Sequence, residues 1–273
     1  MEGLTQPFLP AQPVVGIQLG CRLGGDHPVH NNILELHWSK AILPCKFMDF
    51  NLQAYQADHL LHLSAKPERR VSVLENARHR WLEMDGVVQS AMSLHQPARL
   101  CLPHQRSIAE QLPKQANRIL ELGLGGGDLT RHLAARWPDA HHDCVDLDAE
   151  ILTLFQQFFL PSSGGSPRLH HADALHFLHQ SQESYDLVLL DLFSQDGNPL
   201  LLFQAPLYQA LASRLSGTLI INLLPRTRLE QAQALRLAEE WIGPTHVHDV
   251  PGYRNVILHA TRQHGQGGRA PAG

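Results

Sequence analysis

Four aspartates in the middle of the chain could bind a polar ligand or move a proton. Asp128 ends a glycine-rich run in the segment ELGLGGGD, and Asp146 lies in VDLD. Asp173 and Asp191 follow in HADALHFL and YDLVLLD. Each stands where an apolar run gives way to a loop. In a parallel sheet such positions meet at one edge, where ligands bind.

The glycine loop before Asp128 indicates which ligands suit this edge. Gly123, Gly125 and Gly127 would let a ligand approach the backbone, and the helix that should follow carries a partial positive charge at its start. A dinucleotide fingerprint would place a glycine where Asp128 stands. A carboxylate there repels a pyrophosphate and attracts an ammonium group, so we expect adenosine with a cationic tail. Asp128 is also a good helix N-cap, and that interpretation stays open.

Each of the other acids could bind a ligand or could have a structural role at the end of a strand or helix. Asp146 comes 23 residues after Gly123. In nucleotide-binding sheets an acid at about this distance accepts hydrogen bonds from the ribose hydroxyls. Asp146 or Asp148 could instead end a strand or cap a helix. Asp173 could accept from an adenine amino group or cap the next helix. We favour a functional role for Asp191, because strand ends in this architecture face the ligand.

Strand, loop and helix alternate after Pro103 and should bring these acids together. Five apolar runs predict strands, at 118–123, 142–148, 185–193, 218–223 and 255–260. Helical patterns occupy 128–137, 150–159, 207–215 and 228–242. The alternation predicts an α/β fold, with helices on both faces of a parallel sheet.

The chain divides into four predicted segments. Residues 1–48 are rich in Pro and Gly and are assigned no regular structure. Residues 49–104 read as short strands, with Asp85-Gly86 as a tight hairpin turn, and predict a small antiparallel sheet. Residues 105–262 form the cofactor-binding domain, and 263–273 read as a disordered tail.

Composition limits the classes of function. The chain has 273 residues, a net charge of -4 and no dense Lys/Arg run, so neither a nucleic-acid surface nor a membrane span is indicated. Its four cysteines lack CxxC spacing, which fits reduced thiols in a cytoplasmic protein. Its 19 histidines include no HExxH pattern, so we expect no metal.

Taken together, these segments resemble the spermidine synthase family, aminopropyltransferases whose core is similar to that of S-adenosylmethionine-dependent methyltransferases. The resemblance runs from about 71 to 261 and includes WLEMDGVVQ, which ends at Gln89. It implies a Rossmann-like, methyltransferase-type doubly wound sheet with a small N-terminal antiparallel β domain. It also implies a homodimer that acts on a small-molecule amine.

The resemblance implies roles for individual residues. Asp128 would hold the amine of decarboxylated S-adenosylmethionine, Asp146 its ribose and Asp173 its adenine, while Asp191 would deprotonate the attacking amine. The full cofactor-binding set is Gly123, Gly125, Gly127, Asp128, Asp146, Asp173 and Gln89. The substrate-binding set is Ser194, Tyr208 and Tyr253.

The acceptor side departs from the family pattern. Ser194 stands where the family has a second acid, and the family's Tyr-Gln pair falls on Ala98 and Arg99. Three functions are therefore compared. The first is aminopropyl transfer to an amine with Asp191 as base. The second is methyl transfer from intact S-adenosylmethionine, and the third is nucleoside binding without catalysis.

Overall fold

The computed structural model describes most of the chain from residue 56 to residue 262. The described residues belong to one compact unit, and their ranges are 56–67, 69–160, 165–193 and 197–262. The predicted irregular segment 1–48, the tail 263–273 and Ser194 lie outside them. The segment boundaries proposed from the sequence stay predictions.

A four-stranded antiparallel sheet forms from the first described residues. Its strands run in chain order as β1 (His59–Lys66), β2 (Arg69–Glu75), β3 (His79–Met84) and β4 (Val87–Ser93). Asp85 and Gly86 both have positive φ, 52° and 80°, which is the backbone of a type I′ hairpin turn and confirms the predicted turn. Val88 pairs with Glu83 and Ser90 with Leu82, so Gln89 is the extra residue of a bulge.

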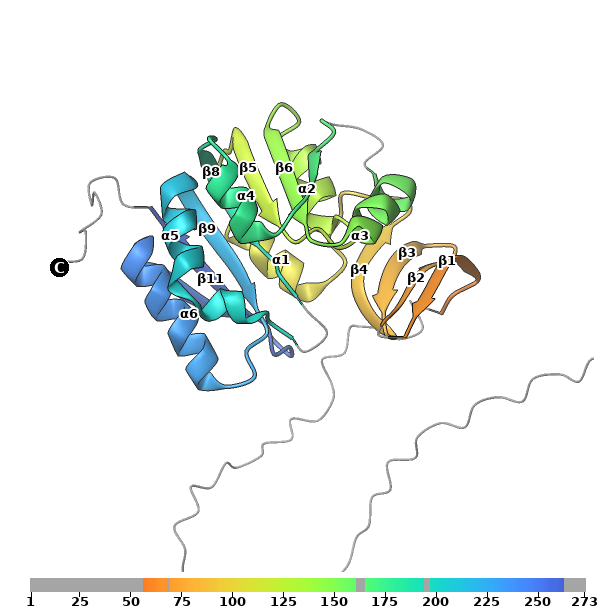
Figure 1. Cartoon of the computed structure of the whole chain (residues 1–273). Helices are drawn as coiled ribbons and strands as arrows, with labels where there is room; N and C mark the ends of the chain where they lie inside the picture. Colours follow the sequence, from red (N-terminus) through yellow and green to blue (C-terminus); the bar gives the residue numbers. More distant parts are fainter. Residues whose placement is uncertain (1–55, 68, 161–164, 194–196, 263–273) are drawn as a thin grey trace, which may run out of the picture. The chain divides into compact units, whose positions relative to one another are not determined.

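A seven-stranded sheet makes up the larger part of the fold (Figure 1). Its spatial order is β10-β11-β9-β8-β5-β6-β7. The strands are β5 (Arg118–Leu122), β6 (His141–Asp146), β7 (Arg168–His171), β8 (Tyr185–Leu190), β9 (Leu215–Leu223), β10 (Thr245–Asp249) and β11 (Val256–Thr261). The five strands from β5 to β9 are parallel, and β11 is antiparallel to both its neighbours.

Helices cover both faces of this sheet, as the alternating pattern predicts. Their bounds are α1 (Pro103–Glu110), α2 (Asp128–Arg136), α3 (Ala149–Leu154), α4 (Ala174–Gln180), α5 (Ala205–Arg214) and α6 (Arg228–Trp241), with a π-helical turn η2 (Phe155–Phe159) and a 3-10 turn η3 (Leu200–Phe203). One core contains α4, α5 and α6, and another contains α1 and α2. The doubly wound, Rossmann-like sheet is therefore confirmed.

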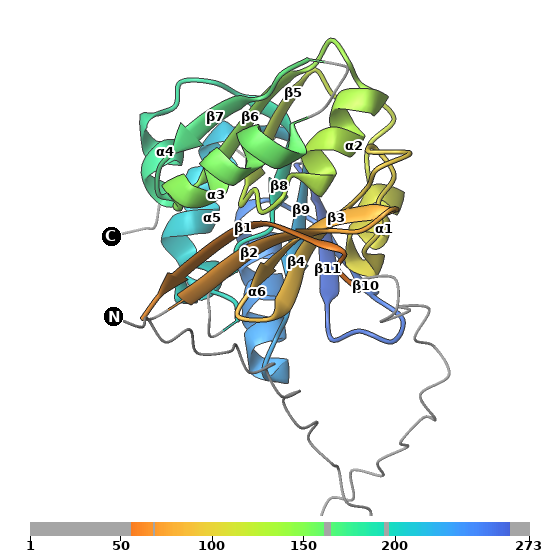
Figure 2. The ribbon, with the colours of Figure 1, turned by 90° about the vertical axis from the view of Figure 1, so that its right-hand side faces the viewer.

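The small sheet packs against α3 and η2 of the larger domain (Figure 2). Val73 and Leu82 share a buried apolar cluster with Phe155 and Phe159 of η2. Burial of this apolar surface stabilises the contact between the two sheets. In the described part of the chain, no helix is both long and apolar enough to cross a membrane.

The order of the strands fixes the place of the ligand site. After β5 the chain adds β6 and β7 on one side, and it then returns to add β8 on the other side of β5. The loops that leave β5 and β8 therefore run in opposite directions from the sheet. Ligands bind in the crevice at this point, where the strand order reverses. Gly123 follows β5, and Asp191 follows β8.

Candidate functional site

The glycine loop after β5 contains two kinds of glycine. A Cβ on Gly123 would lie 2.2 Å from the carbonyl oxygen of Asp191, and one on Gly127 would lie 2.1 Å from the ring of Phe155. These two are glycines because of close packing. Gly125 has φ +53° and nothing within 4 Å of an added Cβ. It is the member of the loop that leaves space for a ligand to reach the backbone.

Asp146, at the end of β6, holds the glycine loop in place. One carboxylate oxygen accepts the amide of Leu124 at 2.9 Å, and the other accepts the amide of Asp148 at 2.9 Å. Burial raises the pKa of Asp146, and these two amides oppose the shift. A carboxylate has about four acceptor positions, so Asp146 can still accept a ribose hydroxyl. Leu147 beside it is 70% exposed and offers an apolar surface to a nucleobase.

Asp148 and Asp173 both cap helices, the alternative role that the sequence allowed for them. Asp148 caps α3 by accepting the amide of Glu150 at 2.9 Å, and it pairs with Arg69. Asp173 caps α4 by accepting the amide of His176 at 2.9 Å. The adenine contact proposed for Asp173 stays a prediction, because capping occupies only one of its two oxygens.

Asp191 lies beside the glycine loop, where its amide donates to the carbonyl of Leu122. Burial raises its pKa to about 7, helped by the negative charges of Glu121 and Asp128. Asn222 on β9 donates to its Oδ1 at 2.8 Å and opposes that shift. A carboxyl that titrates near neutrality is suited to accept a proton from a substrate.

A second amide orients the partner of Asp191. Asn255 donates from Nδ2 to the side-chain oxygen of Asn222 at 3.0 Å, which directs the amide group of Asn222 toward Asp191. Asn222 was missed by the sequence reasoning. The sequence could have indicated it, since Asn222 is the one amide in the largely apolar strand TLIINL.

Asp128 is used in contacts within the fold, and its predicted contact with a cofactor amine stays a prediction. Its side chain is 1% exposed and forms an ion pair with Arg131, three residues further along α2. Its other oxygen accepts the amide of Ala91 on β4 at 2.9 Å, and Gln105 also bonds to it. Burial raises its pKa, and Arg131 and Ala91 oppose that shift. The carboxylate is therefore used to join α2 to β4, which leaves it little capacity for a cofactor amine.

Arg131, the partner of Asp128, also has its guanidinium used within the fold. It donates to the carbonyls of Pro97 and Phe159, both at 3.1 Å, and to that of Gly126. Its charge also lies 5.7 Å from the ring of Phe159. The Asp128–Arg131 pair is a structural tie that organises the glycine loop.

The predicted substrate residues lie in different surroundings. Tyr208 lies on α5 and is fully buried in the core, and its hydroxyl donates to the carbonyl of Leu202 at 2.9 Å. Packing leaves its ring no free surface in this structure, and its contact with substrate stays a prediction. Tyr253 is 36% exposed and lies in the turn before β11. That strand pairs with β9, the strand that carries Asn222. Gln89 is half-buried, and its Nε2 donates to the carbonyl of Val87 at 3.3 Å.

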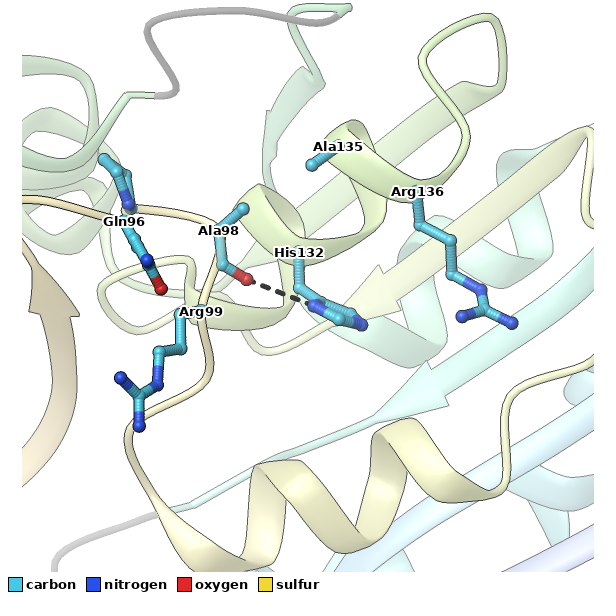
Figure 3. A pocket seen from close by; sticks show the side chains of 7 residues that line it. Gln96, Ala98, Arg99, His132, Ala135 and Arg136 are labelled. Atoms are coloured by element: carbon cyan, nitrogen blue, oxygen red, sulfur yellow. Dashed lines mark hydrogen bonds between the residues drawn. The ribbon is translucent and has the colours of Figure 1, made fainter.

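A separate open hollow of about 540 Å³ lies between the loop after β4 and the outer side of α2. Figure 3 shows Arg99 on the loop and Arg136 on the helix, with His132 between them. The Nδ1 of His132 lies 3.1 Å from the carbonyl oxygen of Ala98. None of the predicted site residues lines this hollow, and its two arginines would repel a cationic amine.

The larger sheet and its glycine loop have the methyltransferase-type fold. Residues 119–202, from β5 to η3, match the family model described as a methyltransferase domain. The structure of human methyltransferase-like protein 13 in complex with SAH is similar, with a TM-score of 0.54 at 23% identity over 63% of this chain and 86% of that one. The methyltransferase-type fold predicted from the sequence is confirmed.

The chain is also similar to polyamine aminopropyltransferases, the family that its motifs resemble. A polyamine aminopropyltransferase of Neisseria meningitidis is 28% identical over 163 residues, which cover 56% of this chain and 60% of that protein. The chain thus matches about three fifths of the length of that relative. The structure of a probable spermidine synthase from Corynebacterium glutamicum has a TM-score of 0.65 at 20% identity, over 73% of this chain and 79% of that one.

Proposed function

We propose that this protein transfers the aminopropyl group of decarboxylated S-adenosylmethionine to a small amine. The observation that carries the proposal is Asp191, a buried carboxyl with its pKa raised to about 7 at the strand switch point. It lies beside a glycine loop in which Gly125 is open to a ligand. The similarity to proteins named polyamine aminopropyltransferases supports the choice of the aminopropyl group.

The residues present fit the adenosine part of this cofactor. Gly125 leaves the backbone accessible, Asp146 retains acceptor capacity for ribose hydroxyls, and Leu147 offers apolar surface to the base. When bound, the sulfonium supplies an electrophilic carbon and leaves as the neutral thioether methylthioadenosine. Asp191 takes the proton of the amine as its nitrogen bonds to that carbon and the carbon–sulfur electron pair passes to sulfur.

Asn222 and Asn255 position Asp191 for this proton transfer. Asn222 donates to one carboxylate oxygen of Asp191 at 2.8 Å and leaves the other for the amine, while Asn255 orients Asn222 through a hydrogen bond of 3.0 Å. A carboxylate fixed in this way loses little entropy when the amine arrives. We expect the reaction rate to rise with pH through about 7, as Asp191 loses its proton.

Methyl transfer from intact S-adenosylmethionine is the second candidate, and one observation favours it. Asp128 is paired with Arg131, so its charge is compensated, and the carboxylate that distinguishes intact S-adenosylmethionine would meet little repulsion there. The same glycine loop and Asp146 would bind the adenosine of either cofactor. The cytoplasmic location and the dimer implied by the family resemblance stay predictions.

The identity of the nucleoside product separates the two candidates. The protein is incubated with putrescine and either cofactor, and the products are identified by mass spectrometry. Methylthioadenosine with an aminopropylated amine supports the proposal, while S-adenosylhomocysteine with a methylated product refutes it. Asp191→Asn should abolish turnover, and Glu183→Gln, which changes an exposed carboxylate paired with Arg118, should not. Cofactor binding measured by calorimetry without either product would indicate a non-catalytic nucleoside-binding protein.

A further inference from the structure

A second group of polar side chains is buried two residues before the glycine loop. Glu121 on β5 and Cys144 on β6 are directly paired, and His142 shares the face of Cys144 because it lies two residues earlier on the strand. The residues are 2%, 0% and 8% exposed. One ligand atom from each lies within 4.8 Å of the others. The proposed transfer reaction uses none of them.

The separations between these atoms match those around a tetrahedral zinc ion. The Oε2 of Glu121 lies 3.1 Å from the Nε2 of His142 and 3.7 Å from the Sγ of Cys144. Zinc bonds of about 2.3 Å to sulfur and about 2.0 Å to nitrogen and oxygen place an O–N pair about 3.3 Å apart and an S–O pair about 3.6 Å apart. These two separations, with all three donor atoms within 4.8 Å of one another, fit ligands of one ion.

The hydrogen bonding of His142 points to a missing partner. Its Nε2 is buried and makes no hydrogen bond within the described part of the chain, although the carboxylate of Glu121 is near. Buried polar atoms are almost always satisfied, and an exception needs an explanation. A metal ion between the nitrogen and the carboxylate would accept the lone pair of the nitrogen.

Charge also favours a cation at this place. Thr130 of α2 donates to Oε2 of Glu121 at 2.7 Å, but Thr130 is neutral. The nearby guanidinium of Arg131 is paired with Asp128. Buried charges are usually paired or bound to metals, so the carboxylate of Glu121 needs positive charge from either His142 or an ion.

We propose that Glu121, His142 and Cys144 bind a divalent transition-metal ion of the zinc type, under α2 and next to the cofactor loop. Thiolate and imidazole donors select zinc or cobalt over magnesium and calcium. Binding replaces the thiol proton of Cys144, which passes to solvent. The Oγ1 of Thr130 lies 3.6 Å from Sγ, so this hydroxyl or a water is placed to complete the ligand set. The proposal replaces our expectation, drawn from sequence spacing, that the chain binds no metal.

Cobalt substitution tests the proposal with a signal that only a thiolate ligand gives. The experiment uses the full chain with Cys21, Cys45 and Cys101 changed to Ser, so that Cys144 is the remaining thiol. After treatment with a chelator, the folded protein is titrated with Co²⁺. We expect one equivalent to produce a thiolate-to-cobalt charge-transfer band in the near ultraviolet, and Zn²⁺ to remove it by competition. The other histidines of the chain cannot produce this band.

The same titration can overturn the proposal. A folded protein without the band would show that Glu121 and His142 form a metal-free imidazole–carboxylate pair. Cys144→Ala in the same background must lose the band, and His142→Gln must weaken Co²⁺ binding by roughly tenfold or more. If these variants fail to fold, the band of the single-cysteine parent still decides, because Cys144 is its only source of thiolate.

Discussion

Replacing Asp191 by Asn should make the protein more stable at alkaline pH while removing its activity. An aspartate in an unfolded chain titrates near pH 4, whereas the buried carboxyl of Asp191 has its pKa raised to about 7. The folded state therefore binds this proton more tightly than the unfolded state does. The free energy of unfolding falls as pH rises from about 4 to about 7, and the loss is complete above that pH.

The size of this effect follows from the shift. Three pKa units correspond to about 4 kcal/mol over the full range, of which about 2–3 kcal/mol falls between about pH 5 and about pH 8. Asp191 is only partly buried when its whole residue is considered, so solvent screens its charge in part. We therefore expect a change of about 2 kcal/mol. Asn at this position keeps an oxygen that accepts from Asn222 and has no proton to lose.

Urea unfolding followed by circular dichroism at about pH 5 and about pH 8 measures the difference. The free energy of unfolding of Asp191→Asn should gain about 2 kcal/mol relative to the wild type between these two conditions. Asp139→Asn, which changes an exposed carboxylate in a turn, is the control and should follow the wild type at both. If the difference for Asp191→Asn is independent of pH, the acid is not held protonated by burial and the reasoning is refuted.

Four further variants test the structural assignments. Arg131→Met should destabilise the fold by about 3–5 kcal/mol in a denaturant titration, because it leaves the carboxylate of Asp128 buried without its partner. Gly125→Ala should cost about 1 kcal/mol of stability and weaken cofactor binding in calorimetry, whereas Gly123→Ala should prevent folding because its methyl group meets a carbonyl oxygen. Tyr208→Phe should lower stability by about 1 kcal/mol and leave turnover unchanged, and a large loss of turnover would support its predicted contact with substrate.

The sequence predicted the parts of the fold that depend on local pattern. Alternation of strands and helices after Pro103 indicated the parallel sheet, and Asp85-Gly86 indicated the hairpin turn. Both depend on backbone preferences and periodicity, which neighbouring residues determine. The resemblance in the glycine loop and in VDLD indicated which edge of the sheet carries the site.

The roles of single side chains were harder to predict, because they depend on partners. Asp128 and Arg131 stand at i,i+3 on a helix, so their pairing could have been considered from the sequence. The burial of Asp128 under β4 could not, since it follows from the packing of residues about forty positions apart. The cluster of Glu121 and Cys144 likewise depends on the register of two parallel strands, which no local pattern fixes.

The contact between β4 and the glycine loop couples the two sheets during motion and unfolding. Ser90 packs where a Cβ on Gly126 would lie, 1.9 Å from its hydroxyl oxygen, and the next amide, that of Ala91, donates to Asp128. The loop that would hold the cofactor therefore has a strand of the small sheet as one wall. Amide hydrogen exchange should slow in β4 as well as in the loop when adenosine ligands bind, because both segments open as one cooperative unit.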